Sequence, residues 1–126
     1  MLLYIVLARY YIGVGMKTHE HVTPRQEALA ERKLCAAIAA LKTTEECQAF
    51  LRDLCTPAEL QAMADRWTVV DYLKRGLPYR EIHRLTGVSV TTIGRVARFL
   101  ARGNGGYATA VRRLEERRLT VLGARV

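Results

Sequence analysis

Cysteine and histidine are scarce in this 126-residue sequence, and their spacing excludes several kinds of site. The three cysteines, Cys35, Cys47 and Cys55, are odd in number and form no CxxC pair. The three histidines are not placed to complete a zinc site with them. We therefore expect no metal, no cofactor and no disulfide framework, and a reduced protein of the cytoplasm whose cysteines act as small apolar side chains.

Catalytic motifs are also missing from the sequence. There is no glycine-rich phosphate loop, and no nucleophile stands beside a base. The acidic pairs Glu45-Glu46 and Glu115-Glu116 fit solvated helix charges better than a catalytic site. We therefore expect a protein that is not an enzyme.

Long hydrophobic runs are limited to the first fifteen residues, MLLYIVLARYYIGVG. This run is shorter than the roughly 20 residues of a membrane span, and Arg9 interrupts it. It also lacks the basic start and cleavage site of a secretory signal. Residues 1–22 are interpreted as an N-terminal extension, either an over-extended gene start with translation beginning at Met16, which we favour, or a peripheral anchor.

Positive charge is abundant. Lysine and arginine total 20 against 12 acids, giving a net charge of +8, while half of the residues are hydrophobic, as in a globular protein. Such an excess indicates a polyanionic partner, because neutralising phosphates releases condensed counterions. Charge by itself does not distinguish DNA from RNA or a membrane surface.

Helix starts are marked by one repeated pattern. Thr23, Thr43 and Thr56 are each followed three residues later by Gln or Glu, which is typical of a capping box. Apolar residues at helical spacing follow each start, and the third helix is expected to end at Arg75-Gly76. No segment alternates like a strand. With two short helices after Pro78 and a last helix over about 107–119, the sequence predicts an all-α protein of six helices, with one domain over 23–119 and a tail over 120–126.

The segment from Tyr79 to Arg102 predicts a helix-turn-helix. Ile82 and Thr86 face inward from the first helix, and Gly87 provides the left-handed turn. Val88 fills the space at the angle between the two helices, and Ser89 caps the second helix. These residues predict a rigid pair of helices.

The second of these helices has two different faces. Ile93, Val96 and Leu100 form an apolar stripe, whereas the opposite stripe carries Thr91, Arg95, Arg98 and Arg102. Five arginines against one acid lie between Tyr79 and Arg102, so the positive charge is concentrated where a nucleic acid would be contacted.

Two residues of this segment leave alternatives open. Gly94 lies mid-helix, at a cost of roughly 1 kcal/mol relative to alanine. It is either drift or, as we favour, a device that lets the helix approach base edges closely. His83 replaces the small residue usual at its position, and its ring either tilts outward toward a phosphate or is partly buried and satisfied by a local carbonyl.

Three motifs, LCTPAELQAMADRW, YREIHRLTGVSVTTIGRVARFL and GNGGY, together resemble the Trp repressor superfamily, and most closely its YerC/YecD-type branch. The resemblance covers about Leu34 to Leu114. It implies a six-helix fold and an intertwined homodimer in which two recognition helices read a palindromic operator. By the same resemblance Trp67 is expected in the core, and the dimer core is expected to contain Leu34, Ile38, Leu41, Phe50, Leu51, Leu54, Leu60 and Met63.

The resemblance also indicates an altered corepressor pocket. Arg66 and Arg95 match the two arginines that sandwich tryptophan in Trp repressor, and Thr56 matches a residue near the ligand. Val96 and Phe99 depart from the glycine and serine that make room for it and receive its amino group. We therefore expect a pocket filled by its own side chains, DNA binding without tryptophan, and an unknown effector if any.

The resemblance assigns DNA contacts residue by residue. Arg80 and Arg95 are candidates for guanine recognition, and Val90 and Thr91 for thymine methyl contact. Arg84, Arg98 and Arg102 are expected to hold phosphates. The complete predicted DNA surface is Arg80, Arg84, Ser89, Val90, Thr91, Gly94, Arg95, Arg98 and Arg102.

The sequence therefore predicts a homodimeric, sequence-specific regulator of transcription, expected to be a repressor, that binds double-stranded DNA in the cytoplasm, at the nucleoid, without a membrane partner. The alternative is a helical dimeric adaptor that binds DNA without sequence specificity.

Overall fold

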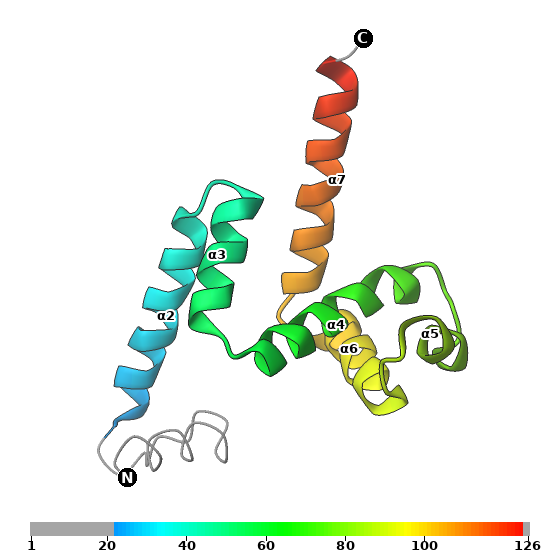
Figure 1. Cartoon of the computed structure of the whole chain (residues 1–126), viewed down its shortest axis with the longest axis horizontal. Helices are drawn as coiled ribbons and strands as arrows, with labels where there is room; N and C mark the ends of the chain where they lie inside the picture. The colour runs from blue at the N-terminus through cyan, green and yellow to red at the C-terminus, as the bar shows by residue number, and fades with distance from the viewer. Residues whose placement is uncertain (1–21, 125–126) are drawn as a thin grey trace. The chain divides into compact units, whose positions relative to one another are not determined.

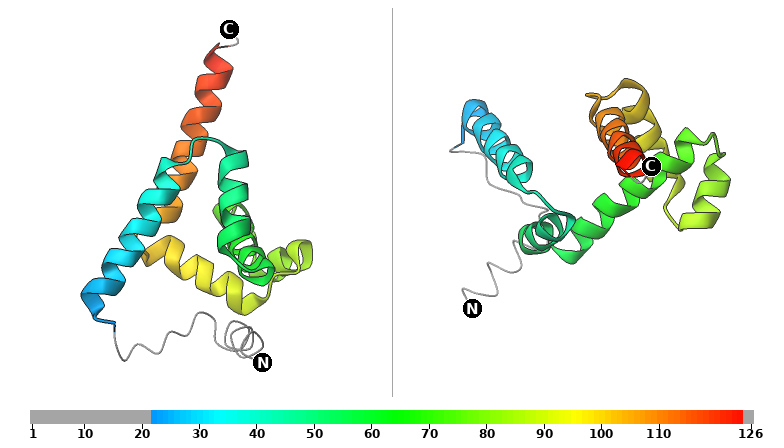
Figure 2. Two further views of the ribbon diagram at one scale, coloured as in Figure 1. Left: turned by 60° about the vertical axis from the view of Figure 1, so that its left-hand side comes forward. Right: turned by 90° about the horizontal axis from the view of Figure 1, so that it is seen from above.

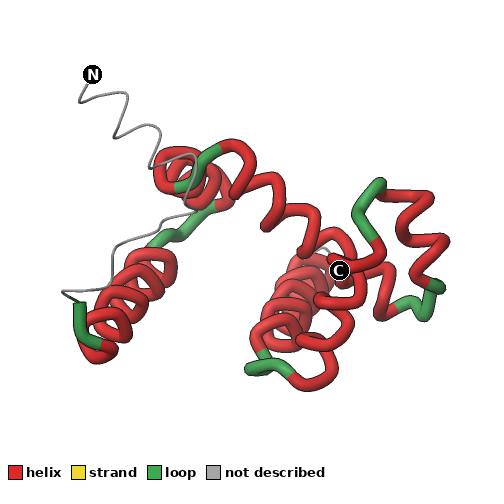
Figure 3. The backbone as a smooth tube through the Cα atoms, turned by 90° about the horizontal axis from the view of Figure 1, so that it is seen from below, coloured by secondary structure: helices red, strands yellow, loops and turns green. Residues whose placement is uncertain are grey.

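The computed structural model describes residues 22–124, so the predictions made for the apolar N-terminal segment and for Met16 lie outside the described residues. Within that range every regular element is a helix (Figure 3). The chain divides after Phe50 into two compact units.

Six helices follow one another along the described chain (Figure 1). Their bounds are α2 (Pro24–Ala40), α3 (Thr44–Leu54), α4 (Pro57–Lys74), α5 (Tyr79–Thr86), α6 (Val90–Arg102) and α7 (Gly106–Ala124). The predicted all-α class and the six helices are confirmed.

All three predicted capping boxes are present. The Thr23 hydroxyl accepts from the Gln26 N–H at 3.2 Å, and the Thr43 hydroxyl accepts from the Glu46 N–H at 3.1 Å. At the start of α4 the Thr56 N–H donates to Glu59 Oε1 at 2.9 Å, and this bond, together with one from the Thr56 side chain, lowers the pKa of the Glu59 carboxyl. These local bonds explain why helices begin where the sequence predicted.

The core of the second unit lies where α4, α5 and α6 meet, and Figure 2 shows these helices from two further sides. Ile82 of α5 and Ile93 of α6 are both fully buried. The complete buried cluster is Val69, Val70, Ile82, Val88, Ile93 and Val96. Tyr107 and Val111 of α7 pack against this cluster from outside, so one small core holds the helix-turn-helix and anchors the start of α7.

The last helix is longer than predicted. The sequence suggested an end near Leu119, but α7 continues to Ala124. Within this last stretch the Thr120 hydroxyl donates to the Glu116 carbonyl one turn earlier at 3.0 Å. In Figures 1 and 2 the C-terminal part of α7 extends away from α4, α5 and α6.

Trp67 is not a core residue of this chain. Its side chain is 40% exposed, and its ring stacks on Tyr107 with the ring centroids 6.4 Å apart. The prediction of a buried Trp67 is therefore wrong for the single chain. Helical spacing placed Trp67 on the apolar side of α4, but among these neighbours it is Val69 and Val70 that enter the small core.

The residues predicted to form a dimer core are likewise not buried within one chain. Helix α2 has no buried residue, and neither has α3. Leu34, Ile38, Leu54 and Met63 are exposed, with Ile38 at 44%. Leu41, Phe50, Leu51 and Leu60 are half-buried.

Candidate nucleic-acid interface

Helices α5 and α6 form the predicted helix-turn-helix. Gly87 ends α5 with a φ of +74°, and its N–H donates to the His83 carbonyl at 2.8 Å. Val88 is buried, and the Ser89 hydroxyl caps α6 by accepting from the Thr92 N–H at 3.2 Å. Each of these roles was predicted from the sequence, because each depends on the conformation of a few consecutive residues.

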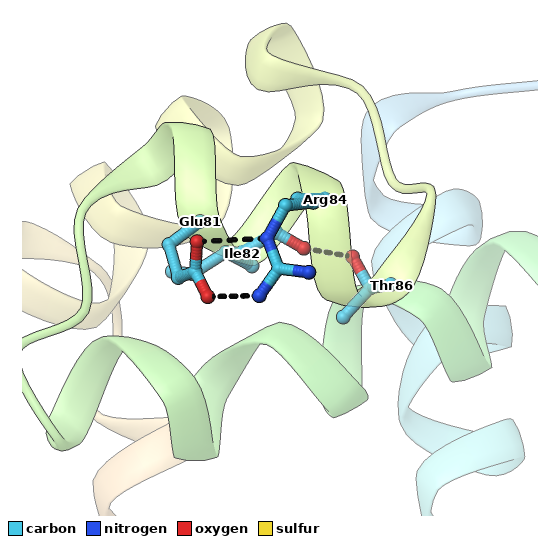
Figure 4. Close-up of polar contacts among 4 residues, drawn as sticks. All are labelled: Glu81, Ile82, Arg84 and Thr86. Carbon is cyan, nitrogen blue, oxygen red and sulfur yellow. Dashed lines mark hydrogen bonds and ion pairs between the residues drawn. The ribbon is translucent and has the colours of Figure 1, made fainter.

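Side chains of α5 brace the turn on two sides. The Thr86 hydroxyl donates to the Ile82 carbonyl at 2.6 Å (Figure 4) and accepts from the Val88 N–H at 3.1 Å. The Nδ1 atom of His83 lies 2.7 Å from the Val88 carbonyl oxygen. Of the two alternatives for His83, the contact with a local carbonyl is confirmed, although the residue as a whole is exposed. Together these bonds restrain the angle at which α6 leaves the turn.

The predicted DNA surface lies on the open side of this motif. Ile93 and Val96 of α6 are buried, while Thr91 and Arg95, on the opposite stripe, are exposed. The other exposed members of the surface are Arg80, Arg84, Ser89, Val90, Arg98 and Arg102, and Gly94 is half-buried. The structure therefore brings the predicted contacts together on α5 and α6, with four of the five arginines free of any acidic partner among the described residues.

Arg84 is the exception, because it is paired with Glu81 one turn earlier on α5 (Figure 4). Its Nε donates to Oε2 at 3.0 Å and its Nη2 to Oε1 at 2.5 Å. The hydrogen bonds from Arg84 lower the pKa of the Glu81 carboxyl, and the carboxylate raises the pKa of Arg84 in turn. Sequence reasoning counted Glu81 as a lone acid, although opposite charges three residues apart on a helix indicate such a pair.

Glu81→Gln is expected to tighten DNA binding severalfold, because it removes a negative charge from the proposed surface and releases Arg84 toward a phosphate. The slope of log K against log salt should become steeper by about 1. Fluorescence anisotropy with a labelled duplex at several salt concentrations measures both effects. Glu45→Gln makes the same change in net charge on α3, and equal gains in the two variants would contradict a local role for Glu81.

Gly94 has space beside it. A Cβ atom at this position would lie 3.8 Å from Cε2 of Tyr79, which is ordinary van der Waals contact. Packing within the chain therefore does not require glycine here. Both interpretations of Gly94 therefore remain: neutral drift of the sequence, and close approach of the helix to DNA.

A hollow of about 310 Å³ lies where the altered corepressor pocket was predicted. Its lining consists of Arg66, Arg95, Val96, Phe99, Asn104, Gly106 and Tyr107. Thr56 is not among these residues, and Asn104, Gly106 and Tyr107 were not foreseen. The GNGGY link that supplies them was predicted only as a motif of the family resemblance and not as part of a pocket.

Val96 and Phe99 both line this hollow, and their role in filling a corepressor pocket stays a prediction. Val96 is buried in the core, and Phe99 stays 39% exposed. The guanidinium carbon of Arg95 lies 5.1 Å from the centre of the Phe99 ring, and that of Arg98 lies 5.4 Å from it. These contacts hold the ring in the wall of the hollow.

Residues 22–124 were also compared with the requirements of a membrane span and of a metal site. No helix in this range is long and apolar enough to cross a membrane. No three acidic, histidine or cysteine side chains of the same range lie close enough to hold a metal ion.

A family model described as Trp repressor protein matches residues 30–115. The chain belongs to the Trp repressor family. The match includes the whole helix-turn-helix and agrees with the extent of the predicted resemblance, which is confirmed. The family is regulatory and not enzymatic, in agreement with the missing catalytic motifs.

Relatives of this family member are found among bacterial proteins. It is 43% identical over 84 residues to the uncharacterised protein YerC of Bacillus subtilis, an alignment that covers 67% of this chain and 81% of YerC. The crystal structure of a TrpR-like protein from Eubacterium eligens is 34% identical, with a TM-score of 0.67, and the match covers 74% of this chain and 96% of that protein. The crystal structure of a candidate Trp repressor from Staphylococcus aureus is also 34% identical, with a TM-score of 0.65. This match covers 79% of this chain and 96% of that protein.

Proposed function

We propose that this protein is a homodimeric, sequence-specific DNA-binding regulator of transcription, with repression the direction that its family suggests. The observation that carries the proposal is the exposed stripe of α6. Thr91 lies near the start of the helix and Arg95 one turn later, on a helix whose other face is buried at Ile93 and Val96. A helix held rigidly in this way and presenting hydroxyl and guanidinium groups suits the major groove.

The contacts divide into two groups. Arg80 and Arg95 read guanine through paired hydrogen bonds, and Val90 and Thr91 contact thymine methyl groups. Gly94 lets the helix axis come close to the bases, while Ser89, Arg98 and Arg102 bind phosphates. Arg84 joins the phosphate contacts if DNA separates it from Glu81.

The exposed apolar residues of the N-terminal helices support a second copy of the chain as the partner. Helix α2 carries Leu34 and Ile38 one turn apart on the same face, both exposed, and has no buried residue. An apolar helix face of this kind requires a partner, because isolated chains rarely leave contiguous apolar surface in water. Two copies would present two α6 helices to the two halves of a palindromic operator.

The experiment that tests this function selects preferred sequences for the full chain from a pool of random duplexes. We expect a palindromic site that is bound in preference to bulk DNA even as salt rises, and a free protein with twice the mass of one chain. The preference should appear without tryptophan and should not change when tryptophan is added. Binding that falls steeply with salt and shows no preferred sequence would instead support the non-specific adaptor.

A further inference from the structure

Phe99 occupies an unusual place on the proposed DNA-reading helix. It lies on α6 but does not belong to the buried core or to the partly buried residues packed against it. Phe99 remains 39% exposed within the chain. The packing of α4, α5 and α6 therefore does not explain why phenylalanine stands here.

The Phe99 ring lies against the guanidinium groups of two arginines. The guanidinium carbon of Arg95, one turn earlier, lies 5.1 Å from the ring centre, and that of Arg98 lies 5.4 Å from it. The negative face of an aromatic ring attracts a guanidinium at these distances. One side chain thus restrains two of the four unpaired arginines of the proposed DNA surface.

Restraint matters for arginine more than for most residues. Its long side chain loses much rotational freedom when its fork is fixed on a base, and this loss opposes binding. An arginine that already lies along a ring loses less freedom when DNA arrives. The benefit is greatest for a paired contact to guanine, which needs one geometry, and small for a loose phosphate contact.

We propose that Phe99 is a positioning residue that holds Arg95 and Arg98 in place for operator recognition. The inference rests on the proposed function. It predicts that Phe99 acts through the arginines and not by touching DNA. It also predicts that loss of the ring harms recognition of the operator more than binding to random DNA.

The test compares Phe99→Leu, which keeps an apolar side chain but removes the aromatic face, with Phe99→Tyr, which keeps the ring. We expect Phe99→Leu to weaken operator binding by about threefold to tenfold and random-DNA binding by less than about twofold, with Phe99→Tyr close to wild type. In an Arg95→Ala, Arg98→Ala background, Phe99→Leu should have no further effect. Matching thermal unfolding of the two Phe99 variants would exclude a general loss of structure.

A second readout does not need DNA. In the free protein the Nε–H resonances of Arg95 and Arg98 should carry a ring-current shift that Phe99→Leu removes and Phe99→Tyr retains. Unchanged resonances, or unchanged operator preference in Phe99→Leu, would overturn the positioning role while leaving the proposed function intact. A wild-type protein without any operator preference would overturn the proposed function, and this inference with it.

Discussion

Ile93→Ala is expected to destabilise the folded chain by about 2 to 5 kcal/mol. Ile93 is fully buried and lies in the small cluster at which α4, α5 and α6 meet. Its truncation leaves a cavity beneath the DNA-reading helix, and few other buried side chains can move in to fill it. Urea unfolding followed by circular dichroism measures the change, at one protein concentration because the unfolding of a dimer depends on concentration.

Two control variants make the Ile93 result specific. Ile93→Val removes a single methylene and should cost about 0.5 to 1.5 kcal/mol. Leu85→Ala removes a similar volume from an exposed position of α5 and should change stability by less than about 0.5 kcal/mol. A loss for Ile93→Ala no larger than that for Leu85→Ala would contradict the core assignment.

Arg80→Ala is expected to reduce operator affinity by about 1 to 3 kcal/mol and to relax the base preference at one position of each half-site. Arg80 is exposed in the first turn of α5 and pairs with no acid among the described residues. A guanidinium in this state is available for the two acceptors of guanine. Repeating the sequence selection with the variant shows whether one position loses its preference.

Arg102→Ala is the matched comparison, because Arg102 is also exposed but stands at the end of α6. A phosphate contact there carries no sequence information, so all duplexes should weaken alike, and the salt slope should flatten by about 1. Equal losses on operator and random DNA in both variants would contradict the division between base-reading and phosphate-binding arginines.

Much of the helix-turn-helix was predictable from a few consecutive residues. Gly87 adopts positive φ, Ser89 caps α6, and Val88 is buried, as their residue types suggest. The three capping boxes are equally local, since threonine and its partner stand only three residues apart. Such features depend on backbone conformation and nearby bonds, which a sequence displays directly.

Side-chain arrangements were harder to predict, and the errors share a cause. Trp67 has the spacing of a core residue but stacks on Tyr107 at the surface of the single chain. Phe99 lies in the lining of a hollow with its ring against Arg95 and Arg98, an arrangement that the sequence did not predict. Each outcome depends on where neighbouring side chains point, and helical periodicity does not contain that information.

By itself, the sequence of this protein determined the helices, their caps, the tight turn and the positively charged face of the helix-turn-helix, because local bonds and periodicity govern all of these. Only the tertiary structure decided that a hollow remains beside Val96 and that the Phe99 ring lies against the guanidinium groups of Arg95 and Arg98. These features arise from rotamers chosen among competing neighbours in three dimensions. The proposed DNA surface is thus a prediction of sequence, and the state of its individual arginines is a finding of structure.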